Sequence, residues 1–223
     1  MKLYGVPLSV HTRKVIIAAR MKQIPFDLQV VIPIIPDSPP PDLLHISPTV
    51  LIPAIDDNGF RLADSTAIIQ YLEQIHPAPP VVPNGAKARG QTLFLDAWAG
   101  SALFRDIMHP IFYNQVVNPG MRNLPPDQDA LAAALGTAAP RAFNYLESLA
   151  PGDHLLGGGI TLADLAVMSN LVQFHYLGHR IGPDFPKLSA YFQRHLASPL
   201  LRAVLADETS FADQMGLDRS FLG

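Results

Sequence analysis

The chain contains no cysteine. It therefore cannot form disulfide bonds, cannot build a thiolate metal site, and cannot supply a thiol nucleophile of its own. This absence fits a reducing compartment, and we expect a cytoplasmic location.

Long apolar runs and clusters of positive charge are also missing. No apolar run approaches the roughly 18–20 residues that a membrane helix needs, and the N-terminus lacks the apolar region of a secretory signal. Only 16% of the 223 residues are charged, and the net charge is −3. Because nucleic-acid binding relies on a positively charged surface, we expect a protein that binds neither nucleic acid nor membrane. The 48% hydrophobic content predicts a folded chain with a substantial core.

The first third of the chain alternates between strand-like and helix-like patterns. The Asn58-Gly59 pair, between two short apolar stretches, predicts a hairpin turn. Five prolines between positions 33 and 41 exclude a regular helix there. We expect strands at residues 2–6, 26–32, 50–55 and 60–62, and helices at residues 12–22 and 66–75.

A proline-rich linker follows, and every later segment has a helical pattern. Pro110 and Pro140 are expected to bend or interrupt the first two of these helices. The order of elements predicts two domains, one α/β and one all-α. The expected helices cover residues 88–117, 127–149, 161–177, 187–195 and 199–206.

Pro53 lies inside the predicted strand 50–55. Because proline cannot donate to a sheet, it must lie at an edge, at a bulge or after a cis bond. A cis Ile52–Pro53 bond would leave the Ile52 backbone free to pair with an extended peptide. An ordinary edge-strand proline is the alternative.

Two polar positions coincide with predicted helix starts. Asp64-Ser65 opens one helix, where free N–H groups and the serine hydroxyl could bind a carboxylate. Asp64 could hold an amine, so the pair would suit an α-amino acid group. Ser9 precedes the first helix and could stabilise an anion, with His11 or Thr12 as the next candidates. At both places a simple helix cap is the alternative reading.

The order and spacing of these segments resemble the glutathione transferase family. The stretches that carry the resemblance are Leu3-Tyr4-Gly5-Val6-Pro7-Leu8-Ser9, Ile52-Pro53-Ala54-Ile55, the segment 62–72 and Thr161-Leu162-Ala163-Asp164. The serine at position 9 makes the phi and theta classes the most similar ones. The resemblance implies a thioredoxin-like domain with a mixed four-stranded sheet (1–76), a linker (77–87) and an all-helical domain (88–223). It also implies a homodimer.

The same resemblance implies the roles of the site residues. Ser9 would donate a hydrogen bond to the sulfur of glutathione, the co-substrate. Ile52, held by a cis Pro53, would pair with its cysteinyl unit, and Asp64 and Ser65 would bind the γ-glutamyl group. The family usually has a basic residue for the glycyl carboxylate, but residues 32–44 contain none. His45 is the nearest candidate, with Arg13 or a backbone contact as alternatives.

The helix expected at 88–117 would line a second pocket in the helical domain, for a hydrophobic electrophile. The apolar side chains of this helix recur with helical spacing, and this pattern could equally belong to the hydrophobic core. Arg105 and His109 favour a pocket, because a buried polar side chain needs a partner. The candidate pocket residues are Phe104, Met108, His109, Phe112 and Tyr113. We expect no metal.

The expected activity is detoxifying conjugation of glutathione to an electrophile. Peroxidase, dehalogenase or isomerase activity would use the same thiolate. The alternative is a glutathione-transferase-like binding or interaction protein with little catalysis.

Overall fold

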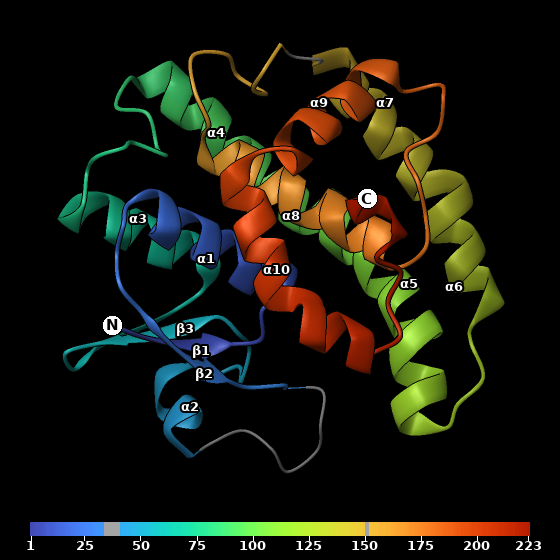
Figure 1. The fold of residues 1–223 in the computed structure, drawn as a ribbon, viewed down its shortest axis with the longest axis horizontal. Coiled ribbons are helices and arrows are strands. Elements are labelled where there is room, and N and C mark those ends of the chain that lie inside the picture. The colour runs from blue at the N-terminus through green and yellow to red at the C-terminus, as the bar shows by residue number, and fades with distance from the viewer. Residues whose placement is uncertain (34–40, 150–151) are drawn as a thin grey trace.

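The computed structural model describes residues 1–33, 41–149 and 152–223, and its first part is built on a four-stranded sheet (Figure 1). The strands are β1 (Lys2–Gly5), β2 (Asp27–Val30), β3 (Ala54–Asp57) and β4 (Phe60–Ala63). They lie in the order β2-β1-β3-β4, with β1 parallel to β2 and antiparallel to β3. The sheet is mixed and four-stranded, as predicted.

The β3–β4 hairpin follows directly from its local sequence. Asp57 pairs with Phe60, so Asn58 and Gly59 alone form the loop. Their φ angles are 54° and 92°, which asparagine and glycine tolerate better than other residues. This turn confirms the predicted hairpin.

Helices cover both faces of the sheet, because successive side chains of a strand point to opposite faces. Leu3 and Ile55 pack with α1 (Val10–Met21) and α3 (Ser65–Ile75) on one face. Tyr4 and Ala54 pack on the other face, against α2 (Pro41–Ile46). Figure 1 shows α1 and α3 above the sheet and α2 below it.

The strand predicted at 50–55 is only partly correct. Pairing begins at Ala54, and Val50 has a left-handed φ of 57°. The Ser47 hydroxyl accepts a hydrogen bond from the Leu51 N–H at 3.1 Å and holds this bend outside the sheet. Residues 34–40, which make up most of the proline-rich stretch 33–41, lie outside the described residues.

The first long helix of the second part runs from Ala86 to Arg122 with changes in its winding. It consists of α4 (Ala86–Trp98), a π-helical segment (Ala99–Met108), α5 (His109–Phe112) and a second π-helical segment (Tyr113–Arg122). Pro110 lies in the first turn of α5, where its missing N–H breaks the regular bonding ladder. Wide helical turns flank Pro110 on both sides.

The remaining helices complete an all-helical part. They are α6 (Gln128–Ala133), continued by a π-helical segment (Ala134–Ala138), α7 (Ala139–Leu149), α8 (Leu162–Tyr176), α9 (Pro186–Leu196), α10 (Pro199–Gln214) and a short 3-10 turn (Ser220–Leu222). The helix α10 continues eight residues beyond the end predicted for it. Among the described helices, none combines the length and hydrophobicity needed to span a membrane.

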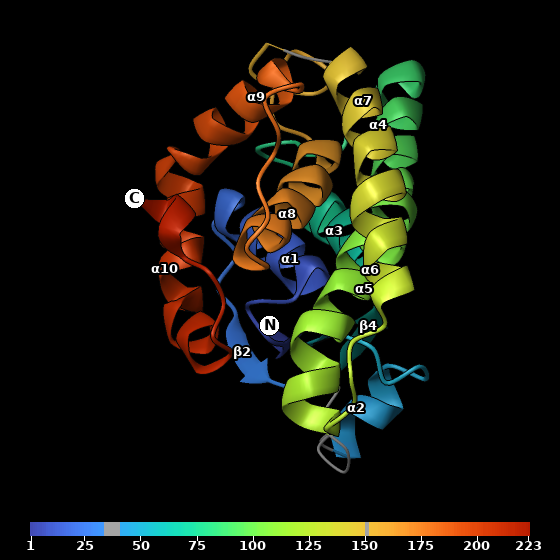
Figure 2. The same cartoon turned by 90° about the vertical axis from the view of Figure 1, so that its right-hand side faces the viewer.

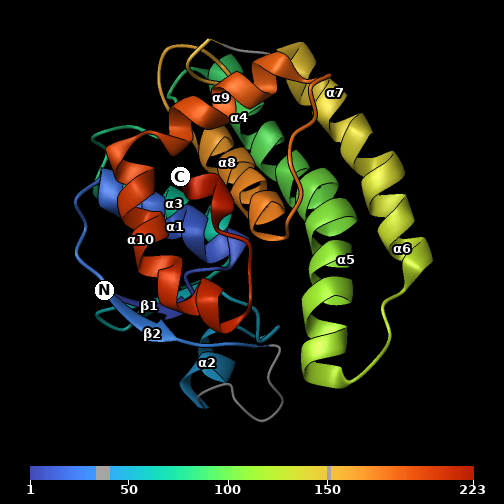
Figure 3. The same cartoon turned by 45° about the vertical axis from the view of Figure 1, so that its right-hand side comes forward.

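The helix α8 forms the centre of the molecule, and every one of its residues is buried. Figures 2 and 3 show other helices on several sides of it, with α1 and α4 packed against it. Thr161 and Asp164 form the capping box predicted at its start: the Thr161 N–H donates to Asp164 Oδ2 at 2.8 Å.

Buried ion pairs fasten the two parts together. Arg13 of α1 donates to both carboxylate oxygens of Glu208 of α10, at 2.6 and 2.9 Å, and both side chains are fully buried. Lys14 of α1 pairs with Asp96 of α4 at 2.6 Å. One continuous hydrophobic core includes residues of both parts.

Candidate functional site

The segment before β3 provides the first wall of a cavity. The Ile52–Pro53 peptide bond is cis, as one of the sequence alternatives predicted. Because the pairing of β3 begins at Ala54, Ile52 lies outside the sheet ladder. Its backbone is therefore placed where an added extended segment could pair with it.

The start of α3 provides the opposite wall. Asp64 is the N-cap residue, and its Oδ1 accepts hydrogen bonds from the N–H groups of Thr66 and Ala67, each at 2.9 Å. Asp64 has a φ of 77°, a conformation that costs free energy in any residue other than glycine and is typical of functional sites. Ser65 follows it and is only 4% exposed. Both the capping role and the predicted position at a helix start are confirmed.

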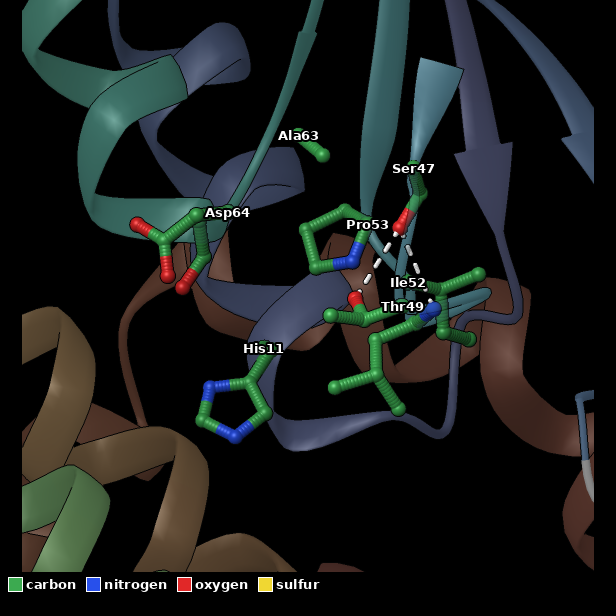
Figure 4. Close-up of a pocket in the computed structure, with 9 residues that line it drawn as sticks. His11, Ser47, Thr49, Ile52, Pro53, Ala63 and Asp64 are labelled. Carbon is green, nitrogen blue, oxygen red and sulfur yellow. Dashed lines mark hydrogen bonds between the residues drawn. The ribbon is translucent and has the colours of Figure 1, made fainter. Parts of the chain in front are cut away.

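A cavity of about 240 Å³ lies between these walls. Its lining brings together four residues that the sequence predicted, Ile52, Pro53, Asp64 and Ser65. Figure 4 shows Asp64 on one side, Ile52 and Thr49 on the other, and Pro53 between them. The lining also includes residues that sequence reasoning did not assign to a site: Ser47, Thr49, Leu51 and Ala63.

Ser9 is the N-cap residue of α1, and its hydroxyl oxygen accepts a hydrogen bond from the Thr12 N–H at 3.4 Å. It is partly exposed but is not among the residues that line the cavity. Thr12 is fully buried, and a Cβ added at Gly5 would lie only 2.5 Å from its hydroxyl. Thr12 therefore packs closely against Gly5 and does not line the cavity.

His11 lies in the cavity (Figure 4), next to the predicted second pocket. Its ring meets the edge of the Phe104 ring, with the centroids 4.5 Å apart. Burial, and to a smaller extent the Lys14 ammonium, lowers the pKa of His11 to about 4, although Asp64 and Asp96 oppose this change. The ring is therefore neutral at pH 7 and can donate or accept a hydrogen bond.

An aromatic series leads from His11 onto the long helix. The His109 ring lies 6.1 Å from that of Phe104 and stacks on Tyr113 at 4.2 Å. Phe112 meets Tyr113 edge to face at 6.1 Å. Four of the five predicted pocket residues thus form one connected surface beside the cavity.

Part of the pocket argument is wrong. Met108 is only 1% exposed and packs in the hydrophobic core, so the structure does not place it on this surface. Arg105 and His109, which we expected to be buried, are exposed, and Arg105 pairs with its neighbour Asp106 at 2.8 Å.

The two candidate anchors for a glycyl carboxylate do not reach the cavity lining. His45 lies exposed in the last turn of α2 and is not part of the lining. The alternative anchor, Arg13, is excluded because its guanidinium is fully buried against Glu208.

A second group of polar side chains lies at the start of α8. Among the described residues, His154, Asp164 and His195 bring possible metal-ligand atoms within 4.8 Å of one another. Each oxygen of the Asp164 carboxylate already accepts two hydrogen bonds. The carboxylate is thus committed to capping, and the expectation of no metal stays a prediction.

Comparisons with known proteins agree with this architecture. The family profile described as "Glutathione S-transferase, N-terminal domain" matches residues 3–80, and the corresponding C-terminal profile matches residues 128–194. The chain is 29% identical to mouse glutathione S-transferase theta-3 over 203 residues, which are 87% of this chain and 81% of that protein.

Two further comparisons concern a solved structure and a bacterial relative. The structure of human glutathione transferase theta-2 in complex with glutathione and an unknown ligand matches with a TM-score of 0.83 and 26% identity, over 96% of this chain and 90% of that one. FtsZ-localized protein A of Caulobacter vibrioides is 25% identical over 92% of this chain and 90% of its own length. The two profiles together cover well over half of the sequence, and this chain belongs to the glutathione transferase family.

Proposed function

We propose that the protein is a glutathione transferase that activates the glutathione thiol for attack on a hydrophobic electrophile. The observation that carries this proposal is the cavity between the Ile52–Pro53 bend and the start of α3. It combines a backbone segment outside the sheet ladder with a helix N-terminus and a carboxylate. These are the features that an extended γ-glutamyl peptide requires.

The γ-glutamyl group would lie at the start of α3. Oδ1 of Asp64 is occupied by two backbone N–H groups, whereas Oδ2 makes no hydrogen bond to the described residues. Oδ2 is therefore available to the α-amine. The Ser65 hydroxyl and the N-terminal end of α3 would hold the α-carboxylate, and Ile52, held by Pro53, would pair with the cysteinyl unit.

Ser9 would stabilise the thiolate. Its oxygen accepts from the Thr12 N–H, which leaves the hydroxyl proton free to be donated to sulfur. Lowering a thiol pKa from about 8.5 to about 6.5 requires about 2.7 kcal/mol. A hydrogen bond to a charged group supplies about 1.5–3 kcal/mol, and a helix N-terminus adds about 0.3–1 kcal/mol. Neutral His11 in the cavity is the second group within the site that could donate to sulfur.

The electrophile would lie on the aromatic surface formed by Phe104, His109, Phe112 and Tyr113. There the sulfur electron pair forms a bond to an electrophilic carbon, while the leaving group departs with its own electron pair. The thiol proton passes to solvent. The same thiolate could also serve dehalogenation, isomerisation or peroxide reduction. The proposal includes a role in detoxification and a location in the cytoplasm.

We propose the domain division given by the resemblance, with a glutathione-binding domain at 1–76, a linker at 77–87 and a helical domain at 88–223. Lys22 supports the position of the linker, because its ammonium donates to the carbonyl oxygens of His76 and Pro79 at 2.7 and 2.8 Å. We also propose a homodimer. Phe94 of α4, which is 56% exposed, supports an interface near this region.

Two measurements test the proposed function. Calorimetric titration with glutathione is expected to show saturable binding, and the ultraviolet absorbance of bound thiolate is expected to appear well below pH 8.5. Binding without a lowered thiol pKa would favour the alternative, a glutathione-binding interaction protein. The similarity to FtsZ-localized protein A is the observation that favours this alternative.

A further inference from the structure

The cavity has two chemically different ends. Asp64 lies on one side of the cavity, and Ser47 and Thr49 lie on the other, across Pro53 (Figure 4). Ser65 follows Asp64 in the chain, and Leu51, whose N–H donates to Ser47, belongs to the second side. A γ-glutamyl peptide that pairs with Ile52, with its amine on Asp64, must direct its C-terminal end toward the second end. The residues there decide how that terminus is recognised.

This second end offers a carboxylate little electrostatic stabilisation. The Ser47 and Thr49 hydroxyls bond to each other at 3.3 Å, and the Ser47 oxygen also accepts from the Leu51 N–H at 3.1 Å. These bonds hold the bend and use one of the two hydroxyl protons, so this end keeps one neutral O–H donor and, among the described lining residues, has no cation. Leu51 itself is apolar and 63% exposed.

Cationic side chains near the cavity are engaged elsewhere. Arg13 is paired with Glu208, and Lys14 with Asp96. Among the described residues that line the cavity, His11 alone has a basic side chain, and its pKa is lowered to about 4, so it carries no charge at pH 7. Residues 32–44 contain no lysine, arginine or histidine.

We propose that this pocket recognises the γ-glutamylcysteinyl part of its ligand and makes no use of a C-terminal carboxylate. Its ligand class is then γ-glutamyl thiols in general, including γ-glutamylcysteine and glutathione with a neutral glycyl end. The inference rests on the proposed function and narrows it. A charged hydrogen bond contributes about 1.5–3 kcal/mol, or roughly 10- to 150-fold in affinity, and this discrimination should be missing here.

Calorimetric titration of the full chain with three ligands tests the inference. The ligands are glutathione, its glycyl monoethyl ester and γ-glutamylcysteine. We expect dissociation constants for the three that agree within about threefold. Glutathione binding tenfold or more tightly than the ester would overturn this inference and leave the proposed function standing. Failure of all three ligands to bind would overturn both.

A variant that should distinguish glutathione from its ester provides the second test. Leu51→Lys places an ammonium at the second end of the cavity and should tighten glutathione binding about tenfold or more, without tightening binding of the ester. Added salt should reduce this gain. Ile75→Lys is the matched control, because Ile75 is exposed at the far end of α3, and it should change neither affinity. Equal affinities of the Leu51→Lys variant for glutathione and ester would show that the C-terminal end does not lie there, and would refute the inference.

Discussion

Removal of the Ser9 hydroxyl tests the thiolate chemistry of the proposed site. The hydroxyl has two separable roles, as the cap of α1 and as the proposed donor to sulfur. The capping bond to the Thr12 N–H is long, at 3.4 Å, so its loss in Ser9→Ala should cost only about 0.5 kcal/mol of stability. Loss of the bond to sulfur should cost about 1.5–3 kcal/mol, which raises the pKa of the bound thiol by about one to two pH units.

The assay is the ultraviolet absorbance of bound thiolate as a function of pH, for wild type and Ser9→Ala at saturating glutathione. Ser198→Ala is the matched control, because Ser198 caps α10 through an equivalent bond to the Leu201 N–H at 3.3 Å. This control should lose a similar amount of stability and leave the thiol pKa unchanged. An identical thiol pKa in wild type and Ser9→Ala would refute the assignment of Ser9 and transfer the role to His11.

Three further predictions concern charge. Asp64→Asn should keep the helix cap, because asparagine caps as well as aspartate, but it should weaken glutathione binding about tenfold in calorimetry. The control Asp127→Asn, at the cap of α6, should leave glutathione binding unchanged. Unchanged affinity in Asp64→Asn would contradict the amine contact. Arg13→Met should lower the free energy of unfolding, measured by urea denaturation, by about 3–5 kcal/mol, because it leaves the Glu208 carboxylate buried and unpaired. A decrease of less than 1 kcal/mol would show that the pair does not join the domains. Burial lowers the pKa of His175 from 6.5 to about 4. The contribution of neutral His175 to the free energy of unfolding, on the order of 3 kcal/mol, should be complete above pH 6.5 and disappear as the pH falls to about 4. If His175→Phe loses stability with acid as steeply as the wild type does, this prediction is wrong.

Features fixed by neighbouring residues could be predicted from the sequence. The Asn58-Gly59 turn, the helix start at Asp64 and the capping box of Asp164 each depend on a backbone conformation or cap within four residues. Pro53 was informative for a similar reason, because its missing N–H restricts where it can lie in a sheet.

The face that the helix from Ala86 to Arg122 turns toward the second pocket could not be predicted correctly, because the winding of this helix is not regular. The candidate pocket residues, from Phe104 to Tyr113, share one face only if the helix keeps 3.6 residues per turn. Two π-helical segments interrupt this period, and wider turns rotate later residues onto other faces. Met108 therefore faces the core, whereas His109 is exposed.

Contacts between distant segments were equally out of reach. Arg13 is an alternative anchor for the glycyl carboxylate in the sequence analysis, but it pairs with Glu208, 195 positions away in the chain. The position of His11 in the cavity depends on Phe104 from the other domain. No local pattern in the sequence encodes either contact.

A crystal structure of the protein with bound glutathione tests the central claim most directly. We expect the γ-glutamyl amine at Asp64, the α-carboxylate at Ser65, the cysteinyl backbone paired with Ile52, and the sulfur within hydrogen-bonding distance of the Ser9 hydroxyl. Glutathione bound elsewhere, or lying in this cavity with its γ-glutamyl group at Ser47 and Thr49, would contradict the account.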